Sequence, residues 1–370
     1  MKIVTILGTR PEIIRLSRII PKLDQVSDHV LVHTGQNNAA TLSDIFFSDL
    51  KLRAADHYLG VNEPDFARQI GRIMAACYDL LLHLRPDRLL ILGDTNSALS
   101  GVVAKRLGIP VFHMEAGNRC FDERVPEEVN RRIVDHASDI LLPYTERSRQ
   151  NLLREGFPSN RVFVTGNPIY EVIAAHEKDI AASKALDAFQ VTPGNYFLAT
   201  LHRAENVDDP QRLSAFVEAF RTLGNDYGMK VLVSTHPRTR ARLLSANLGD
   251  DAWVTFTDPR GFFDFVALEK QARCVLSDSG TVQEECAILK VPSVTLRDVT
   301  ERPETIECGA NILTGCDVAS ILSAVAIAME NTGRWLPPPE YLAPAVSDAV
   351  LRIIVGYVHG LSSRAIPGID

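Results

Sequence analysis

Short apolar runs alternate with amphipathic segments along most of the chain. Lys2–Leu7 is apolar at nearly every position, which is typical of a strand buried on both faces of a parallel sheet. Between Asp65 and Leu84, apolar residues instead recur at the three- and four-residue spacing of a helix. The same patterns in the first half predict strands at residues 29–33, 89–92, 111–114, 139–142 and 161–164, and helices at 41–50, 97–107 and 145–155.

The alternation restarts after an alanine-rich helical segment at 170–190. The second half is predicted to contain strands at 196–200, 230–234, 253–257, 275–277 and 293–296, and helices at 212–223, 238–247, 262–271 and 281–289. Alternating strands and helices favour an α/β fold with two Rossmann-like domains that face each other across a cleft. We expect domains at 1–170 and 190–345, and a terminal segment, 346–370, whose helix at 346–359 packs back across the hinge.

Length and charge narrow the class of protein. At 370 residues the chain is too long for one ordinary core and suits two domains. Its hydrophobic content of 46% is typical of a globular protein, and its net charge of −7 argues against a nucleic-acid-binding surface. No apolar run approaches the roughly 18 residues that indicate a membrane span. We therefore expect neither nucleic acid nor membrane as a partner.

Two further features predict a cytoplasmic location. The apolar run in the N-terminal stretch MKIVTILGTR is too short for the core of a signal peptide. The cysteines, at positions 77, 120, 274, 286, 308 and 316, include no CxxC pair. This spacing predicts reduced thiols and no structural zinc site.

Two predicted strands of the first half run into acidic residues. Leu89–Leu92 leads to Asp94, and Val111–Met114 leads to Glu115. Loops at the carboxyl ends of neighbouring parallel strands open onto the same crevice, so the two carboxylates can converge on one ligand. Glu127 is the first residue of a Glu-Glu pair that begins a helix, and it would add a third carboxylate. Each residue alone could be only a helix cap or a helix opening, but three together favour proton-transfer chemistry.

Two strand-to-helix turns are candidates for phosphate binding. Gly8–Glu12 leads into a helix N-terminus and carries Arg10, which could equally pair with a surface acid. Ser277–Thr281 turns through small residues into a helix whose free N–H groups can hold a diphosphate, and Glu285 follows within reach of a ribose. The alternative for this motif is a plain turn with a serine cap. His202, at the exit of the 196–200 strand, is either structural or a group for phosphate contact or proton transfer.

Seven ordered motifs carry a family resemblance: GTRPEIIR, GDTNS, HMEAGNR, VPEEVNRR, HRAENVD, DSGTVQEE and RDVTERPE. Between residue 8 and about residue 304 they resemble the non-hydrolysing UDP-N-acetylglucosamine 2-epimerase family. The resemblance implies a glycosyltransferase-B-like fold with the active site between two Rossmann-like domains, and a homodimer. It implies inversion of C2 in a UDP-sugar without NAD or metal. UDP leaves by anti elimination to a 2-acetamidoglycal and is re-added after C2 is reprotonated on the other face.

The resemblance also assigns roles to residues. Asp94, Glu115, Glu127 and His202 match the catalytic positions. The matches to UDP- and sugar-binding positions are Arg10 and Arg131 near the phosphates and sugar, Ser279 and Gly280 in the diphosphate loop, Glu285 at the ribose, and Phe265 near uracil. Arg15 and Arg302 lie in the same motifs and are expected to contact the substrate. A core role is an equal alternative for Phe265.

Some motif variants resemble one branch of the family. GTRPEIIRLSR, HTGQN, DIFF, HMEAGNRCFD and HRAENVD are similar to enzymes that form UDP-N-acetyl-L-fucosamine from UDP-2-acetamido-2,6-dideoxy-L-talose for capsule or O-antigen. Arg15 stands where UDP-N-acetylglucosamine enzymes carry lysine, and Asn37-Asn38-Ala39 replaces their His-Arg-Glu. Because bacterial enzymes bind an activating second substrate molecule in that region, the resemblance does not predict such activation here.

Three other functions fit parts of the pattern. A hydrolysing epimerase shares the elimination but releases UDP and free sugar, because water captures the glycal. A glycosyltransferase of the same fold would need an acceptor site and no C2 chemistry, which three convergent carboxylates disfavour. A nucleotide-sugar-binding protein without catalysis would lack at least one of the four catalytic matches, and all four are present.

Overall fold

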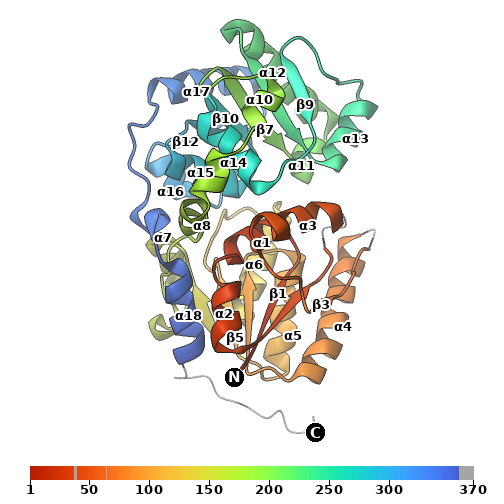
Figure 1. Ribbon diagram of the computed structural model, residues 1–370, viewed down its shortest axis with the longest axis vertical. Coiled ribbons are helices and arrows are strands. Elements are labelled where there is room, and N and C mark those ends of the chain that lie inside the picture. Colours follow the sequence, from red (N-terminus) through yellow and green to blue (C-terminus); the bar gives the residue numbers. More distant parts are fainter. Residues whose placement is uncertain (37–39, 64, 358–370) are drawn as a thin grey trace. The chain divides into compact units, whose positions relative to one another are not determined.

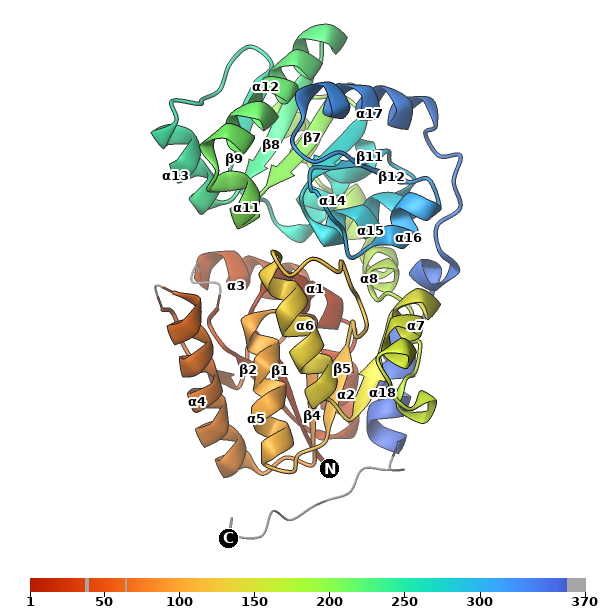
Figure 2. The same cartoon turned by 180° about the vertical axis from the view of Figure 1, so that it is seen from behind.

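The computed structural model describes residues 1–36, 40–63 and 65–357. The chain divides into two compact units. Unit 1 is Met1–Val172 together with the described residues from Glu340 on, and unit 2 is Ile173–Pro339. Each unit is a six-stranded parallel sheet with helices on both faces (Figures 1 and 2), and each is described by itself below.

The sheet of unit 1 has the strand order β3-β2-β1-β4-β5-β6, with every pair parallel. Its strands are β1 (Lys2–Leu7), β2 (Asp28–His33), β3 (His57–Tyr58), β4 (Arg88–Leu92), β5 (Val111–Met114) and β6 (Ile140–Leu142). Since β4 and β5 are neighbours, the residues that follow them share one edge of the sheet.

In unit 1, α4, α5 and α6 cover one face of the sheet and α1, α2 and α18 cover the other (Figures 1 and 2). The helices are α1 (Arg10–Leu16), α2 (Ile20–Val26), α3 (Ala40–Asp49), α4 (Phe66–Leu84), α5 (Ser100–Arg106), α6 (Pro126–Ala137), α7 (Glu146–Arg154), α8 (Ile169–Ala175, which crosses into unit 2) and α18 (Val346–Gly356). Ile73, Cys77 and Leu81 form the buried stripe of α4, because residues four apart share one face of a helix.

The sheet of unit 2 has the order β12-β11-β10-β7-β8-β9, again with parallel pairs. Its strands are β7 (Tyr196–Leu201), β8 (Lys230–Thr235), β9 (Val254–Thr257), β10 (Cys274–Ser277), β11 (Ser293–Thr295) and β12 (Asn311–Leu313). Its helices are α9 (Glu177–Ala181), α10 (Ala185–Phe189), α11 (Ala204–Val207), α12 (Pro210–Tyr227), α13 (Pro237–Ser245), α14 (Phe262–Gln271), α15 (Gly280–Leu289), α16 (Pro303–Glu307) and α17 (Val318–Glu330). Apolar clusters fill the space between the helices and both faces of the sheet.

Most predicted elements are confirmed, and two are wrong in form. The segment predicted as a strand at 161–164 makes only one bridge, from Val162 to Leu141, because the adjacent β6 is three residues long. The helix predicted at 97–107 is split into a tight turn, Asn96–Leu99, and α5. Within that turn, Ser97 donates both its N–H and its hydroxyl to Gln36 Oε1 (3.1 and 2.9 Å). This tether on the first turn accounts for the split.

The observed units differ from the predicted domain limits at their ends. Residues 173–189 fall in unit 2, where Ser183 donates to Asp264 of α14 (2.6 Å). The terminal helix α18 falls in unit 1, where Lys22 of α2 forms an ion pair with Asp348. The predicted end of that helix at residue 359 lies outside the described residues.

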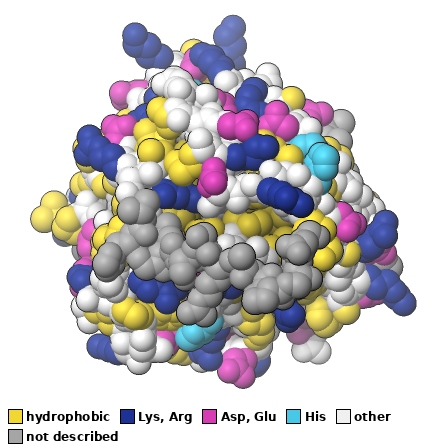
Figure 3. Space-filling model, turned by 90° about the horizontal axis from the view of Figure 1, so that it is seen from below, with side chains coloured by type: hydrophobic (Ala, Val, Ile, Leu, Met, Phe, Trp, Pro, Cys, Tyr) yellow, Lys and Arg dark blue, Asp and Glu magenta, His cyan; other side chains and the backbone are white. Residues whose placement is uncertain are grey.

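Charges of both signs lie on the face of the molecule shown in Figure 3. On the face shown in Figure 3, Lys and Arg side chains are interspersed with Asp and Glu side chains, and neither sign forms a continuous patch. None of the helices in the described ranges combines the length and the apolar character that a membrane span requires.

Candidate active site

The acidic residues after β4 and β5 lie at neighbouring strand ends in unit 1. Gly93 donates its N–H to the Met114 carbonyl (3.0 Å), so the β4–β5 ladder continues to the residue before Asp94. Glu115 donates its own N–H to the Leu142 carbonyl of β6 (3.1 Å). A Cβ placed on Gly93 would lie 3.7 Å from Glu115 Oε2. The loops that carry the two predicted catalytic carboxylates are therefore adjacent.

The Glu115 carboxylate is held by side chains from distant parts of unit 1. Arg15 of α1 forms a buried ion pair with Glu115 Oε2, and the Tyr144 hydroxyl donates to the same oxygen (3.4 Å). Asn118 Nδ2 donates to Oε1 (3.4 Å). The backbone of Glu115 has φ +67°, a left-handed conformation that is unfavourable for a residue with a side chain. Such strain at a buried ionisable residue is a frequent feature of functional sites.

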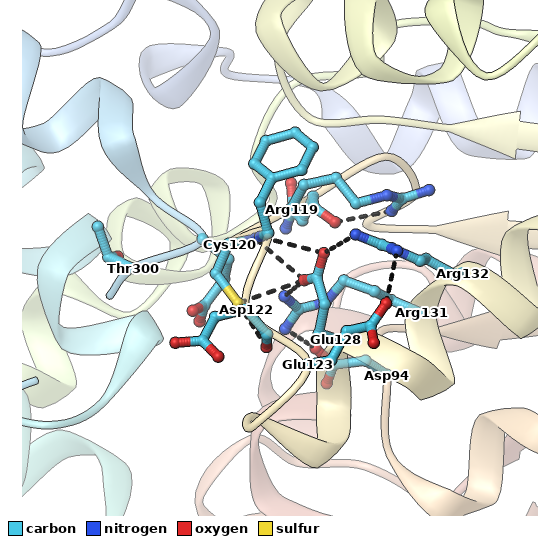
Figure 4. Close-up of polar contacts among 12 residues, drawn as sticks. Asp94, Arg119, Cys120, Asp122, Glu123, Glu128, Arg131, Arg132 and Thr300 are labelled. Carbon is cyan, nitrogen blue, oxygen red and sulfur yellow. Dashed lines mark hydrogen bonds and ion pairs between the residues drawn. The ribbon is translucent and has the colours of Figure 1, made fainter. Parts of the chain in front are cut away.

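Asp94 is joined to α6 through Arg131. Arg131 donates from Nη2 and Nε to Asp94 Oδ2 (2.5 and 3.1 Å) and from Nη1 to Glu128 Oε2 (2.6 Å), so its guanidinium lies between two carboxylates (Figure 4). The Arg131 side chain is 3% exposed, whereas that of Asp94 is 23% exposed. Asp94 therefore offers a solvent-accessible carboxylate that is backed by a buried cation.

Glu128 was not predicted as a site residue, although it follows Glu127 directly. It is fully buried, which would raise the pKa of its carboxyl. The hydrogen bond from the Cys120 backbone and the charge of Arg131 outweigh burial and lower that pKa. Glu128 is therefore an ionised carboxylate within the fold. Neighbouring residues of a helix point in different directions, so Glu127 remains partly exposed.

The helix that carries Glu127 is fixed to the loop that carries Asp94. Glu127 lies in the first turn of α6, where its negative charge complements the positive end of the helix dipole. Asn130 Nδ2, one turn further on, donates to the Asp94 carbonyl (3.0 Å). Together with Arg131, this bond sets the position of α6 relative to Asp94.

Glu12 links the Arg10 turn to the Asp94 loop. Its Oε2 accepts hydrogen bonds from the N–H groups of Gly8 and Thr9 (3.0 and 2.7 Å) and from the Thr9 hydroxyl (2.7 Å). Its Oε1 accepts from the hydroxyl of Thr95 (3.1 Å). Burial raises the pKa of Glu12 to about 7, even though these four donors favour the carboxylate. Arg10 itself is partly exposed at the start of α1, with its guanidinium carbon 5.8 Å from the ring centroid of Phe46.

The sequence analysis also missed a buried pair under these loops. His113 of β5 is fully buried, with Nε2 2.8 Å from the Gly93 carbonyl and Nδ1 2.8 Å from Asp135 Oδ1. Asp135 Oδ2 accepts the N–H of Gly117 (3.1 Å). Burial would raise the pKa of Asp135, but the hydrogen bond and charge of His113 lower it. A histidine inside an otherwise apolar strand was the available signal for this pair.

In unit 2, His202 and Asp278 form a pair at the ends of β7 and β10. His202 Nδ1 lies 2.8 Å from Asp278 Oδ1. Asp278 also accepts the N–H groups of His202 and Arg203 (both 3.0 Å) and Asn206 Nδ2 (3.2 Å). Burial would raise the pKa of Asp278, but the charge and hydrogen bond of His202 lower it to about 2. A buried carboxylate thus fixes the orientation of a half-exposed imidazole, and the sequence analysis had not assigned Asp278 this role.

The predicted diphosphate loop opens α15. Ser279 remains partly exposed at the N-cap, and Gly280 is the first residue of the helix. A Cβ on Gly280 would approach Glu301 Oε1 to 2.6 Å, so a larger residue here would have to displace the Glu301 side chain. Arg302 is 3% exposed and forms a buried ion pair with Glu284 of α15.

The predicted ribose and uracil residues lie deeper in unit 2. Glu285 is 3% exposed and hydrogen-bonds a second buried carboxyl, Glu269 of α14. Burial, followed by the charge of Glu285, raises the pKa of Glu269 well above its ordinary value. Phe265 packs against the apolar cluster that contains Leu268 and Val282 and keeps part of its ring exposed. The loop Asn37-Asn38-Ala39 lies outside the described residues.

The carboxylates with a buried cation in unit 1 and, separately, the oriented imidazole in unit 2 are groups that can transfer protons. Residues 22–354 match the profile of the protein family described as UDP-N-acetylglucosamine 2-epimerase. The chain belongs to this family, and it is an isomerase of the epimerase type.

Individual relatives agree with this assignment. A Methanocaldococcus jannaschii protein named UDP-N-acetylglucosamine 2-epimerase is 42% identical over 347 residues, covering 91% of this chain and 95% of the relative. A Pseudomonas aeruginosa protein named UDP-2,3-diacetamido-2,3-dideoxy-D-glucuronate 2-epimerase is 36% identical over 335 residues, covering 90% and 93%. The crystal structure of the M. jannaschii UDP-GlcNAc 2-epimerase with UDP-GlcNAc and UDP matches with a TM-score of 0.91 at 40% identity, covering 96% of this chain and 99% of that one. The predicted family and the predicted fold class are confirmed.

Proposed function

We propose that the protein inverts C2 of a UDP-N-acetylhexosamine without hydrolysing it. The observation that carries this proposal is Asp94, backed by Arg131, next to Glu115 at the ends of β4 and β5. The hydrogen on C2 is barely acidic, so its removal needs a positioned base, an acid for the opposite face and cations near the leaving diphosphate. Asp94, Glu115 and Glu127 are proposed as the carboxylates, and His202 as a further proton-transfer group.

The proposed reaction balances without a cofactor. A base takes the C2 proton, the C1–C2 double bond forms, and the C1–O bond breaks with its electron pair leaving on UDP. The 2-acetamidoglycal then receives a proton on the other face of C2, and a diphosphate oxygen re-forms the bond to C1. Because no atom is lost, the product differs from the substrate only in the configuration of C2.

The nucleotide is assigned to residues of unit 2. The start of α15, at Ser279 and Gly280, is proposed to hold the diphosphate, because a helix N-terminus carries unsatisfied donors and partial positive charge. The Ser279 N–H already donates to Ser277 Oγ (3.0 Å), so the Ser279 hydroxyl and the Gly280 N–H are the proposed contacts. Glu285 is proposed to accept the ribose hydroxyls, and the exposed part of Phe265 to contact uracil. Positive charge near the phosphates and sugar is assigned to Arg10, Arg15 and Arg131. Arg302 is proposed as a further substrate contact, and it also forms a buried ion pair with Glu284 of α15.

The sugar is proposed to carry an acetamido group at C2. The names of the relatives from M. jannaschii and P. aeruginosa both denote substrates with this group. The motif variants in the chain support a finer proposal, the formation of UDP-N-acetyl-L-fucosamine.

Proton NMR in deuterium oxide tests the reaction and the sugar together. The purified protein is offered UDP-N-acetylglucosamine, UDP-N-acetyl-L-fucosamine or the UDP-diacetamidoglucuronate in separate samples, and deuterium at C2 is followed. Exchange into the L-fuco sugar alone would support both the proposed reaction and the proposed sugar. Exchange into one of the other two sugars would support the reaction and refute the L-fuco assignment. Absence of exchange in all three would refute the proposed function. Accumulation of free sugar would instead identify a hydrolysing epimerase.

A further inference from the structure

Two residues in the loop between β5 and α6 have a strained backbone that no helix end explains. Among the described residues, the non-glycine residues with positive φ number seven. Five of them follow the last turn of a helix, where a left-handed residue is a common cap: Lys51, Arg85, Gln190, Asn247 and Lys290. The other two, Glu115 (φ +67°) and Phe121 (φ +56°), belong to the β5–α6 loop and cap no helix. The proposed catalysis accounts for Glu115, but it gives no role to Phe121.

Phe121 is also unusual in its exposure. Its side chain is 69% exposed, so packing within the fold gives it little stabilisation. A bulky side chain in the left-handed region is unfavourable, and glycine or asparagine would fit the same backbone better. Neither stability nor local geometry therefore explains a phenylalanine at this position.

A buried carboxylate holds this strained conformation. Cys120 and Phe121 donate their N–H groups to Glu128 Oε2 and Oε1 (3.0 and 3.2 Å). Glu128 is fully buried, and Arg131 and Arg132 balance its charge (2.6 and 3.2 Å; Figure 4). Because Arg131 also holds Asp94, the carboxylate that fixes the loop is tied to the cation behind the predicted catalytic residue. Phe121 and Asp94 are thus connected through Glu128 and Arg131.

We infer that Phe121 is a specificity residue whose ring covers an apolar face of the substrate's sugar, and that Glu128 positions it. This inference rests on the proposed function. The loop begins at Glu115 and ends at α6, at the edge where doubly wound sheets bind ligands. A hexosamine offers C–H faces and an acetamido methyl group that an aromatic ring can cover. Since the nucleotide is assigned to unit 2, the ring contributes to affinity for the UDP-sugar and not to affinity for UDP.

Phe121→Gly separates this role from a structural one, because the two predict opposite changes. Glycine relieves the strain, so we expect the Tm to rise by about 2 °C. Loss of the ring should raise KM for the UDP-sugar about tenfold, while the Kd for UDP measured by calorimetry stays unchanged. Arg85→Gly is the matched control, since Arg85 is an exposed left-handed residue at the end of α4. It should give a similar rise in Tm with unchanged KM.

Each other outcome overturns the inference. A fall in Tm for Phe121→Gly would show that the ring supports the fold, and an unchanged KM would show that it does not meet the sugar. Equal losses of affinity for UDP and UDP-sugar would place it at the nucleotide. If the wild-type protein shows no C2 exchange, the proposed function fails, and calorimetry with UDP-N-acetylglucosamine and UDP still decides whether Phe121 contributes to sugar binding.

Discussion

Replacement of Glu12 by glutamine should change how stability depends on pH. Glu12 is 1% exposed, and burial raises its pKa from 4.5 to about 7 in the folded protein. Below about pH 4.5 the carboxyl is protonated in both the folded and the unfolded state, and above about pH 7 it is ionised in both. Between these values the folded protein binds more protons, so its stability falls as the pH rises.

The size of the effect follows from the shift. Each pKa unit corresponds to about 1.4 kcal/mol, so a rise from 4.5 to about 7 corresponds to a loss on the order of 3 kcal/mol across that range. Glutamine does not titrate, yet its amide oxygen can accept from Gly8 and Thr9 and its amide nitrogen can donate to Thr95. Glu12→Gln should therefore fold and should lack this part of the pH dependence.

Urea unfolding at about pH 5 and about pH 8 measures the difference. Both tryptophans, Trp253 and Trp335, lie in unit 2, so unit 1 is better followed by far-UV circular dichroism or by hydrogen exchange in β1. Asp79→Asn is the control, because Asp79 is exposed on α4. The reasoning is refuted if wild-type protein and Glu12→Gln lose the same stability between the two pH values, since the four donors would then fully offset burial.

Three further substitutions test other parts of the site. Asp94→Asn should abolish C2 exchange and leave the Kd for UDP largely unchanged, because it removes a proton-transfer group without altering α15. Loss of affinity for UDP in step with loss of exchange would contradict the proposed role. Asp278→Asn should lower the rate of C2 exchange by about 10²–10⁴-fold, because His202 loses the carboxylate that orients it. The wild type should lose up to about 2 kcal/mol of stability as the pH falls from 3.8 to about 2, and Asp278→Asn should lack this loss. Gly117→Ala should lower the Tm strongly in thermal unfolding. Gly117 has φ +78°, and a Cβ there would lie 2.3 Å from the Ser148 carbonyl oxygen. An unchanged Tm would show that the loop adapts.

The sequence alone determined the class of fold and the order of its elements. Strand β1 and helix α14 have the predicted bounds, because a continuous apolar run and a helical spacing are local signals. The strand-end acids were found for a related reason, since a residue that follows an apolar run in an α/β chain lies at the edge of the sheet. Strands β3 and β12 were not predicted, and β3, with two residues, is too short to show a period.

Only the tertiary structure decided which groups meet at the site. Arg131 binds Asp94 across 37 positions of sequence, and Arg15 reaches Glu115 across 100. Such pairs follow from a strand order in which β4 lies between β1 and β5, and apolar periodicity carries no information about that order. The left-handed backbones of Glu115 and Phe121 likewise depend on hydrogen bonds from elsewhere in unit 1, because nothing in the local sequence favours that conformation.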